Sequence, residues 1–205
     1  TDSAYTDGVI ASKVTVNADH STESLIYNAG IIAQEAIVRA DGSKNTKTFD
    51  ASGNLVSDVA QNSDGSSSST LYDAAGVKTK MHVANSDASH DTYTYNIDGQ
   101  SYTTELQHAD ASGKVTEVTR SHADGSLAYT QIVKADGTKV TALYDSTGHK
   151  MSAITVTSSS TTTDQYDPSG QLTKQMVQHA DGSFTTKIYT ATVLTAHYVV
   201  NADGT

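Results

Sequence analysis

The chain has 205 residues, a formal net charge of −10 and no cysteine, which excludes a disulfide framework, a thiolate metal site and a cysteine nucleophile. Its 13 lysines and arginines are scattered along the sequence, so we expect no nucleic-acid partner. The apolar stretches are too short to span a membrane, and no leader segment is visible in the polar sequence from Thr1 onward.

Glycine and aspartate mark turns at nearly constant intervals. The 14 glycines recur at one or two steps of about 11.5 residues, and turns without glycine are predicted at 17–20, 85–88, 158–160 and 189–192. The segments between turns have about eight residues, which is strand length and too short for a helix. The spacing therefore predicts an all-β fold of about 17 short strands.

The turns are of two alternating kinds. The first is Ala-Asp-Gly-Ser/Thr, whose Asp-Gly pair is typical of the centre of a type I′ turn. The second is Tyr/Phe-Asp-x-x-Gly, whose aspartate, proline and glycine positions indicate a type I turn closed by a G1 bulge. Tight turns at both ends of each strand predict an antiparallel β-meander. The first kind lies at 40–43, 123–126, 135–138, 180–183 and 202–205, and the second at 49–53, 72–76, 144–148 and 166–170.

An aromatic residue precedes most turns of the second kind and marks a hairpin repeat of 22–23 residues. Eight to nine copies fill the chain, which we interpret as a single repetitive β domain over 1–205 with an irregular repeat near 110–126. Apolar residues such as Val14, Val16, Val38 and Val59 alternate with polar ones, a pattern that predicts one packed face. So long a meander is expected to form a curled sheet, a coil or a barrel.

The unit Tyr-Asp-x-x-Gly-x-Leu at 166–172, and its phenylalanine version at 49–55, resemble the YD repeats of the RHS family. The resemblance implies tandem β-hairpins that coil into a shell or tube, in secreted or cell-surface bacterial proteins. The chain departs from the family where the turn glycine is followed by Asn54, Val77, His149 or Gln171, because the family usually has arginine there.

The sequence motifs of common enzyme classes are missing. It contains no Gly-x-Ser-x-Gly, no His-Glu-x-x-His, no phosphate-binding loop and no dinucleotide fingerprint. Each repeat also resembles the others, so no position is distinguished as an active site. We therefore expect a protein without enzymatic activity and without an organic cofactor.

Regularly spaced turn aspartates suggest calcium as a ligand, because carboxylate oxygens are its usual partners. The alternative is that each carboxylate bonds the backbone of its own turn. The best-placed calcium set is Asp50, Asp73, Asp145 and Asp167.

The repeated aromatic residues form the second candidate site. One ring on every second strand places neighbouring rings about 9.6 Å apart along one edge of the sheet. A disaccharide of many extended polysaccharides has a similar length, so the rings predict a stacking surface for sugars. The alternative is that each ring packs on its own hairpin. This aromatic ladder comprises Tyr27, Phe49, Tyr72, Tyr95, Tyr144, Tyr166 and Tyr189.

The sequence favours a non-catalytic bacterial structural or adhesive repeat protein, located outside the cell or at its surface. Unpaired sheet edges near Val9–Val16 and Thr192–Val200 suggest self-association into filaments or a matrix, such as that of a biofilm. Two alternatives remain: a polysaccharide-binding module that uses the aromatic ladder, and a fragment of an RHS-type β-shell.

Overall fold

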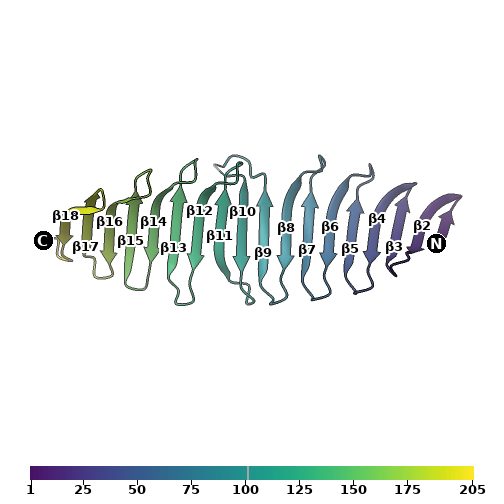
Figure 1. Ribbon diagram of the computed structural model, residues 1–205, viewed down its shortest axis with the longest axis horizontal. Coiled ribbons are helices and arrows are strands. Elements are labelled where there is room, and N and C mark those ends of the chain that lie inside the picture. Colours follow the sequence, from purple (N-terminus) through teal and green to yellow (C-terminus); the bar gives the residue numbers. More distant parts are fainter. Residues whose placement is uncertain (101) are drawn as a thin grey trace. The chain divides into compact units, whose positions relative to one another are not determined.

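The computed structural model describes residues 1–100 and 102–205, and in this part of the chain every regular element is a β-strand. The chain divides into an N-terminal unit (Thr1–Asn96 with Asp110–Gly113) and a C-terminal unit (Ile97–Ala109 with Lys114–Thr205). The N-terminal unit holds the strands β1 (Asp2–Thr6), β2 (Val9–Val16), β3 (Thr22–Asn28), β4 (Ile31–Val38), β5 (Lys44–Phe49), β6 (Leu55–Gln61), β7 (Ser67–Tyr72), β8 (Lys78–Ala84) and β9 (His90–Tyr95) (Figure 1).

The C-terminal unit repeats the same plan. Its strands are β10 (Thr104–Ala109), β11 (Val115–Ser121), β12 (Leu127–Val133), β13 (Lys139–Tyr144), β14 (Lys150–Val156), β15 (Ser160–Tyr166), β16 (Leu172–His179), β17 (Phe184–Thr190) and β18 (Val193–Val200) (Figure 1).

Within each unit, consecutive strands pair in antiparallel fashion, which confirms the predicted β-meander of tandem hairpins. The 18 strands exceed the predicted 17 by one. Among the strand pairings of the described residues, none joins β1 to β9 or β10 to β18, so each unit is an open sheet rather than a closed one.

Both kinds of turn adopt one geometry, which corrects the type I′ prediction for Ala-Asp-Gly. In the turn at 39–42 the Gly42 N–H donates to the Arg39 carbonyl oxygen at 3.0 Å, and only Gly42 has positive φ, +82°. This is a type I turn with a G1 bulge, as at 50–53, where Gly53 N–H bonds Asp50. Consecutive positive φ angles, which a type I′ turn requires, occur instead in the two-residue turns at 7–8, 29–30 and 191–192.

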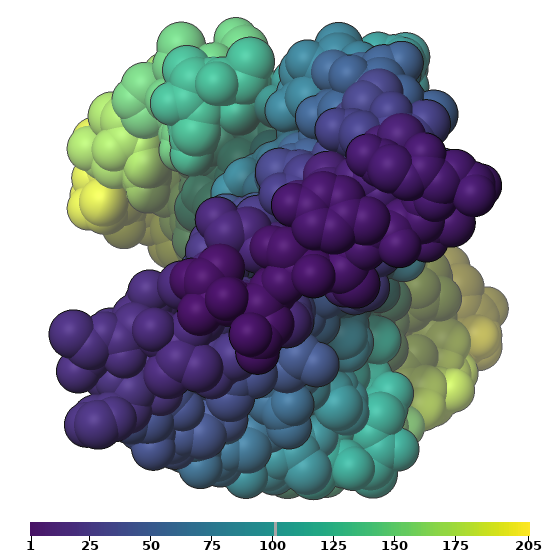
Figure 2. All heavy atoms as spheres, turned by 90° about the vertical axis from the view of Figure 1, so that its right-hand side faces the viewer, coloured from purple at the N-terminus to yellow at the C-terminus, as the bar shows by residue number. Residues whose placement is uncertain are grey.

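Each unit is a single layer, because its strands contact only the strands adjacent to them in sequence. The predicted packed face is therefore wrong: Val16 is 67% exposed, and Val14, Val38 and Val59 are exposed on the same face. Figure 2 looks onto the end of the sheet at which the chain begins, with the first strands, in purple, nearest the viewer. Among the described apolar residues, only Ala128 and Ala142 are buried.

The regular spacing of the strands is interrupted by the connection between β9 and β10, of which residues 96–100 and 102–103 are described. The predicted irregular region 110–126 lies just after β10 and holds the regular strand β11. The Thr103 N–H donates to the Ser121 carbonyl oxygen at 2.9 Å. The Arg120 guanidinium lies 4.8 Å from the Tyr102 ring centre and 4.6 Å from that of Tyr129, and its Nε donates to Glu105 at 2.6 Å. A cation between two rings thus holds the connection against the C-terminal sheet.

Candidate binding site along the turn-flanking aromatic residues

Each aspartate that opens a Tyr/Phe-Asp turn bonds the backbone of that turn. Asp50 Oδ1 accepts from the N–H groups of Ser52 (2.8 Å) and Asn54 (2.9 Å), and its Oδ2 accepts from the Asn54 side-chain amide at 3.0 Å. Equivalent bonds from the second and fourth following residues occur at Asp73, Asp145 and Asp167. The sequence is therefore spaced to satisfy the turn donors locally.

These bonds also favour the ionised carboxylate. The hydroxyl of Thr147, together with the His149 and Thr147 amides, lowers the pKa of Asp145 to about 2. The Asn54 side chain lowers the pKa of Asp50, and the Ser169 hydroxyl lowers that of Asp167. The turn edge therefore carries permanent negative charge at neutral pH.

The four predicted calcium ligands lie in four separate turns, each bonded within its own turn. Across residues 1–100 and 102–205, no group of three or more histidine or carboxylate side chains is close enough to hold a metal ion. The geometry favours the turn-forming role of these aspartates, and a calcium role stays a prediction.

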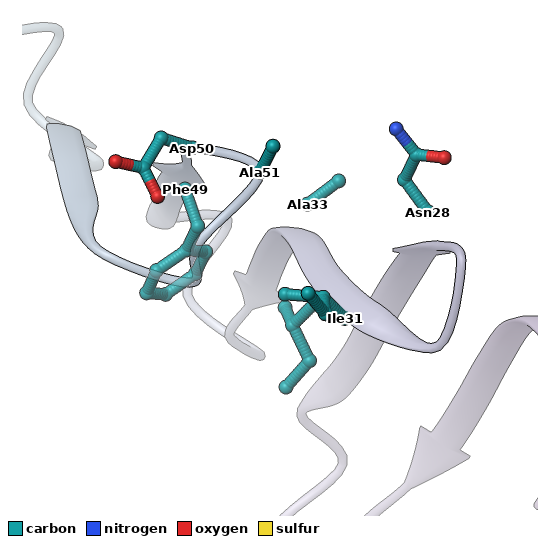
Figure 3. A pocket seen from close by; sticks show the side chains of 7 residues that line it. Asn28, Ile31, Ala33, Phe49, Asp50 and Ala51 are labelled. Atoms are coloured by element: carbon teal, nitrogen blue, oxygen red, sulfur yellow. The ribbon is translucent and has the colours of Figure 1, made fainter.

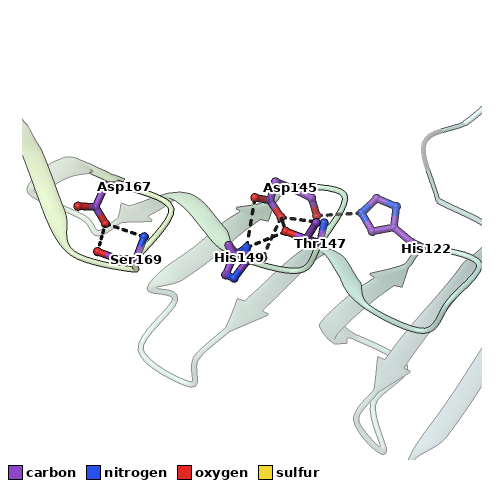
Figure 4. Close-up of polar contacts among 6 residues, drawn as sticks. All are labelled: His122, Asp145, Thr147, His149, Asp167 and Ser169. Atoms are coloured by element: carbon purple, nitrogen blue, oxygen red, sulfur yellow. Dashed lines mark hydrogen bonds and ion pairs between the residues drawn. The ribbon is translucent and has the colours of Figure 1, made fainter.

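Figure 4 shows the most connected of these turns. The Thr147 hydroxyl donates to Asp145 Oδ1 at 2.6 Å and lies 2.7 Å from His149 Nδ1. His122 Nε2, from the preceding hairpin, lies 3.2 Å from the Asp145 carbonyl oxygen. Neighbouring turns on this edge of the C-terminal unit are thus joined by polar contacts.

The aromatic residues of the N-terminal unit lie on one face, here called the aromatic face. Leu25 is opposite Glu35, which is opposite Lys47, so these three side chains share a face. Tyr27 and Phe49 are two residues further along β3 and β5, on that same face. The same argument through Asp58, Thr70, Met81 and Tyr93 adds Tyr72 and Tyr95.

The C-terminal unit has an aromatic face of its own. Ala142 is opposite Ala153, which is opposite Asp164, and Tyr144 and Tyr166 each follow by two residues. The pairing of β15 with β16 and of β16 with β17 adds Tyr189. All seven predicted ladder residues are half-buried, so their rings are only partly available.

Aliphatic residues alternate with the rings, a feature that the sequence prediction missed. Tyr27 pairs with Ile32 and Phe49 pairs with Leu55 across the bulge that follows each turn. Ile10 occupies the equivalent position before Tyr27, opposite Tyr5. Strict alternation of side chains along the strand would place these aliphatic residues on the valine face. The extra residue of the bulge shifts the alternation and brings them to the aromatic face.

Small niches lie between consecutive turns on this edge. One of about 360 Å³ is lined by Ile10, Ala11, Tyr27 and the turns on either side, and the next, of about 70 Å³, by Ile31, Ile32 and Phe49. In Figure 3 the Phe49 ring and Ile31 lie on opposite sides of the smaller niche, and the Asp50 carboxylate points away from the isoleucine. The two niches offer apolar walls and a polar rim to the same side of the N-terminal unit.

The equivalent niche of the C-terminal unit differs in its chemistry. It has a volume of about 240 Å³ and is lined by Asp145, His149, Lys150, Tyr166 and Asp167, among others. Lys150 Nζ lies 4.1 Å from the centre of the Tyr166 ring, so the ammonium group covers one ring face. Tyr166 is therefore less accessible for stacking than the ladder prediction assumes.

A polar niche of about 370 Å³ lies on the opposite edge of the C-terminal unit. It is lined by the serine-rich turn 157–160 and by Gln178, His179 and Gly182. The Ala180 N–H donates to the Ser159 carbonyl oxygen at 3.0 Å and joins the two turns that form it. The sequence signal for this niche is the run of hydroxyl residues at 157–163.

The described residues include no helix with the length and apolar character that a membrane crossing needs. No protein-family model matches the sequence, and no curated protein matches it either.

Two solved structures have weak similarity to the chain. A porin-like protein from Bacteroides uniformis ATCC 8492 is 14% identical, with a TM-score of 0.24 over 92% of this chain and 91% of that one. A TcdB2-TccC3-Cdc42 complex is 12% identical, with a TM-score of 0.23 over 87% of this chain and 12% of that one. Similarities this low carry no argument, and the assignment of tandem β-hairpins rests on the strand pairing above.

Proposed function

We propose that the chain is a non-catalytic structural or adhesive repeat protein, of bacterial origin and located outside the cell or at its surface. The observation that carries this proposal is repetition: one hairpin, most often closed by a type I turn with a G1 bulge, recurs through single-layer sheets whose two faces are largely open. A regular surface of this kind suits a spacer, a matrix component or a filament subunit, in which many equivalent weak contacts add up.

Electron microscopy of the negatively stained protein, with and without millimolar calcium, tests this role. Filaments or sheets that grow with protein concentration support assembly, and a calcium requirement would give the turn aspartates a ligand role. Discrete particles under both conditions, together with a monomeric mass in sedimentation, contradict the filament part of the proposal.

A second candidate function is polysaccharide binding through the aromatic ladder. The niches beside Tyr27 and Phe49 favour it, because each combines a ring, an aliphatic wall and a polar rim. A glycan array probed with the intact protein tests it, and saturable binding to at least one glycan is the expected result.

The RHS-type shell fragment is the third candidate, and the Tyr/Phe-Asp-x-x-Gly turns before β6, β8, β14 and β16 favour it. A segment of the shell that is separated from the rest should be poorly soluble, since apolar surface that the neighbouring repeats would cover is then exposed to water. A protein that stays soluble and monomeric at high concentration contradicts this candidate.

A further inference from the structure

Five side chains on five consecutive strands form a continuous apolar strip along the aromatic face of the N-terminal unit. In strand order from β2 to β6 they are Ile10, Tyr27, Ile32, Phe49 and Leu55, all half-buried. Ring and aliphatic residue alternate, so the strip has one ring for each hairpin.

The apolar strip ends at β7 and β8, where a lysine takes the place of the aliphatic residue. The next ring is Tyr72, whose partner across the bulge is Lys78, so a lysine replaces the aliphatic residue found at Ile32 and Leu55 in the preceding hairpins. In the C-terminal unit the equivalent lysine, Lys150, lies over the Tyr166 ring. In the N-terminal unit, the ladder rings that have an aliphatic partner across the bulge are therefore Tyr27 and Phe49.

The spacing of these two rings matches a polymer rather than a single small molecule. They lie two strands apart, or about 9.6 Å from strand spacing. Each borders its own niche, and Asn28 lines both niches, so the two are adjacent. An extended chain lying across the strands meets one ring per disaccharide, and its intervening residue meets Ile32.

Charge decides which extended polysaccharide fits. On the aromatic face, the Glu35 carboxylate is neutralised by Lys47 at 3.1 Å. The turn carboxylates, such as that of Asp50, remain ionised, and the whole chain has a formal net charge of −10. An anionic polymer approaching the turn edge is repelled at low salt, and a neutral one is not.

We propose that the apolar strip of the N-terminal unit binds a neutral, extended polysaccharide, one disaccharide to each hairpin, through Tyr27 and Phe49. The inference rests on the second candidate function and narrows it to one ligand class and one stretch of sheet.

Calorimetric titration of the intact protein with cellobiose, cellotetraose and cellohexaose tests the proposal, with galacturonate oligomers of matched length as the anionic probe. Affinity should rise about tenfold from the disaccharide to the tetrasaccharide, as the second ring is engaged. The galacturonates should show no saturable binding at low salt.

Variants locate the site. Tyr27→Ala and Phe49→Ala should each lower the affinity for cellotetraose about tenfold, whereas Tyr27→Phe should retain it. Tyr27→Leu and Phe49→Leu remove the ring but keep an apolar side chain, so they replace the alanine variants should those fail to fold. Tyr198→Ala is the matched control, because Tyr198 is 58% exposed and lies outside the aromatic ladder.

The possible outcomes distinguish this proposal from the broader second candidate function. Cello-oligosaccharides that do not bind, galacturonates that bind as tightly, or folded ring variants with unchanged affinity each overturn the proposal. Binding to a different glycan on the array would then leave the second candidate function standing, and no binding to any glycan would overturn both.

Discussion

The two turn glycines Gly148 and Gly170 form a matched pair that separates backbone strain from crowding. Both close a Tyr-Asp turn of the C-terminal unit with nearly equal φ angles, +82° and +81°. A Cβ atom at Gly170 would meet nothing within 4 Å, whereas one at Gly148 would lie 3.2 Å from the Ser126 Cβ. Ser126 Cβ is fixed to the neighbouring turn and cannot rotate away.

Alanine at either site adds strain of about 1–2 kcal/mol in the left-handed region. Alanine also lowers the conformational entropy of the unfolded chain, which offsets about 0.4–1 kcal/mol of this strain. Gly170→Ala should therefore lower the free energy of unfolding by about 1 kcal/mol. Crowding at Gly148 should add about 1 kcal/mol more, the lower end of the cost of overpacking. For a chain of this length each kcal/mol lowers the Tm by about 2–4 °C.

Thermal unfolding followed by circular dichroism measures the difference, with Gly182→Ala as a control whose Cβ would also meet nothing within 4 Å. We expect Gly170→Ala and Gly182→Ala to shift the Tm equally and Gly148→Ala to shift it about twice as far. Equal shifts for all three variants would refute the crowding argument and the packing of Gly148 against Ser126.

Three further predictions concern other contacts. Arg120→Gln should speed hydrogen exchange at the Thr103 amide about tenfold, because it removes the cation–π contacts with Tyr102 and Tyr129 and the ion pair with Glu105; unchanged exchange contradicts this. Because the folded-state pKa of Asp145 is depressed to about 2, its stabilising effect is present above pH 4 and lost from there down to pH 2; a Tm that is constant to pH 2 contradicts this. Lys150→Leu should uncover Tyr166 and add cello-oligosaccharide binding to the C-terminal unit, as calorimetry would show.

The strand pattern was predictable because its signals are local. A glycine at the end of each turn and an aspartate that bonds the next amides determine where a strand stops, and even the turn at 85–88, which lacks glycine, forms as expected, with φ of +66° at Ala88. The Ala-Asp-Gly turn was misassigned because Asp-Gly suits two turn types. The bond from Gly42 back to Arg39 and the positive φ at Gly42 alone distinguish them, and both depend on strand register.

The site was less predictable because it depends on contacts between strands. The ladder residues were identified from their spacing, but their aliphatic partners Ile32 and Leu55 precede bulges that shift the alternation. The position of Lys150 over Tyr166 requires knowing which side chains are diagonal neighbours on adjacent strands. The open valine face was missed because alternation alone does not reveal whether a second layer covers it.

A sheet without a packed interior must draw its stability from turns and cross-strand pairs, and this affects how the binding test is interpreted. The rings of the apolar strip belong to those pairs, since Tyr27 faces Ile32 and Phe49 faces Leu55. Such a pair contributes about 0.2–1 kcal/mol relative to alanine, so losing one ring weakens one hairpin and leaves the turn bonds of its neighbours in place. A ring-to-leucine variant loses less still, because it keeps an apolar side chain. Such a variant therefore separates the stabilising role of the strip from its binding role: if it keeps its Tm and loses its affinity, the ring itself binds the sugar.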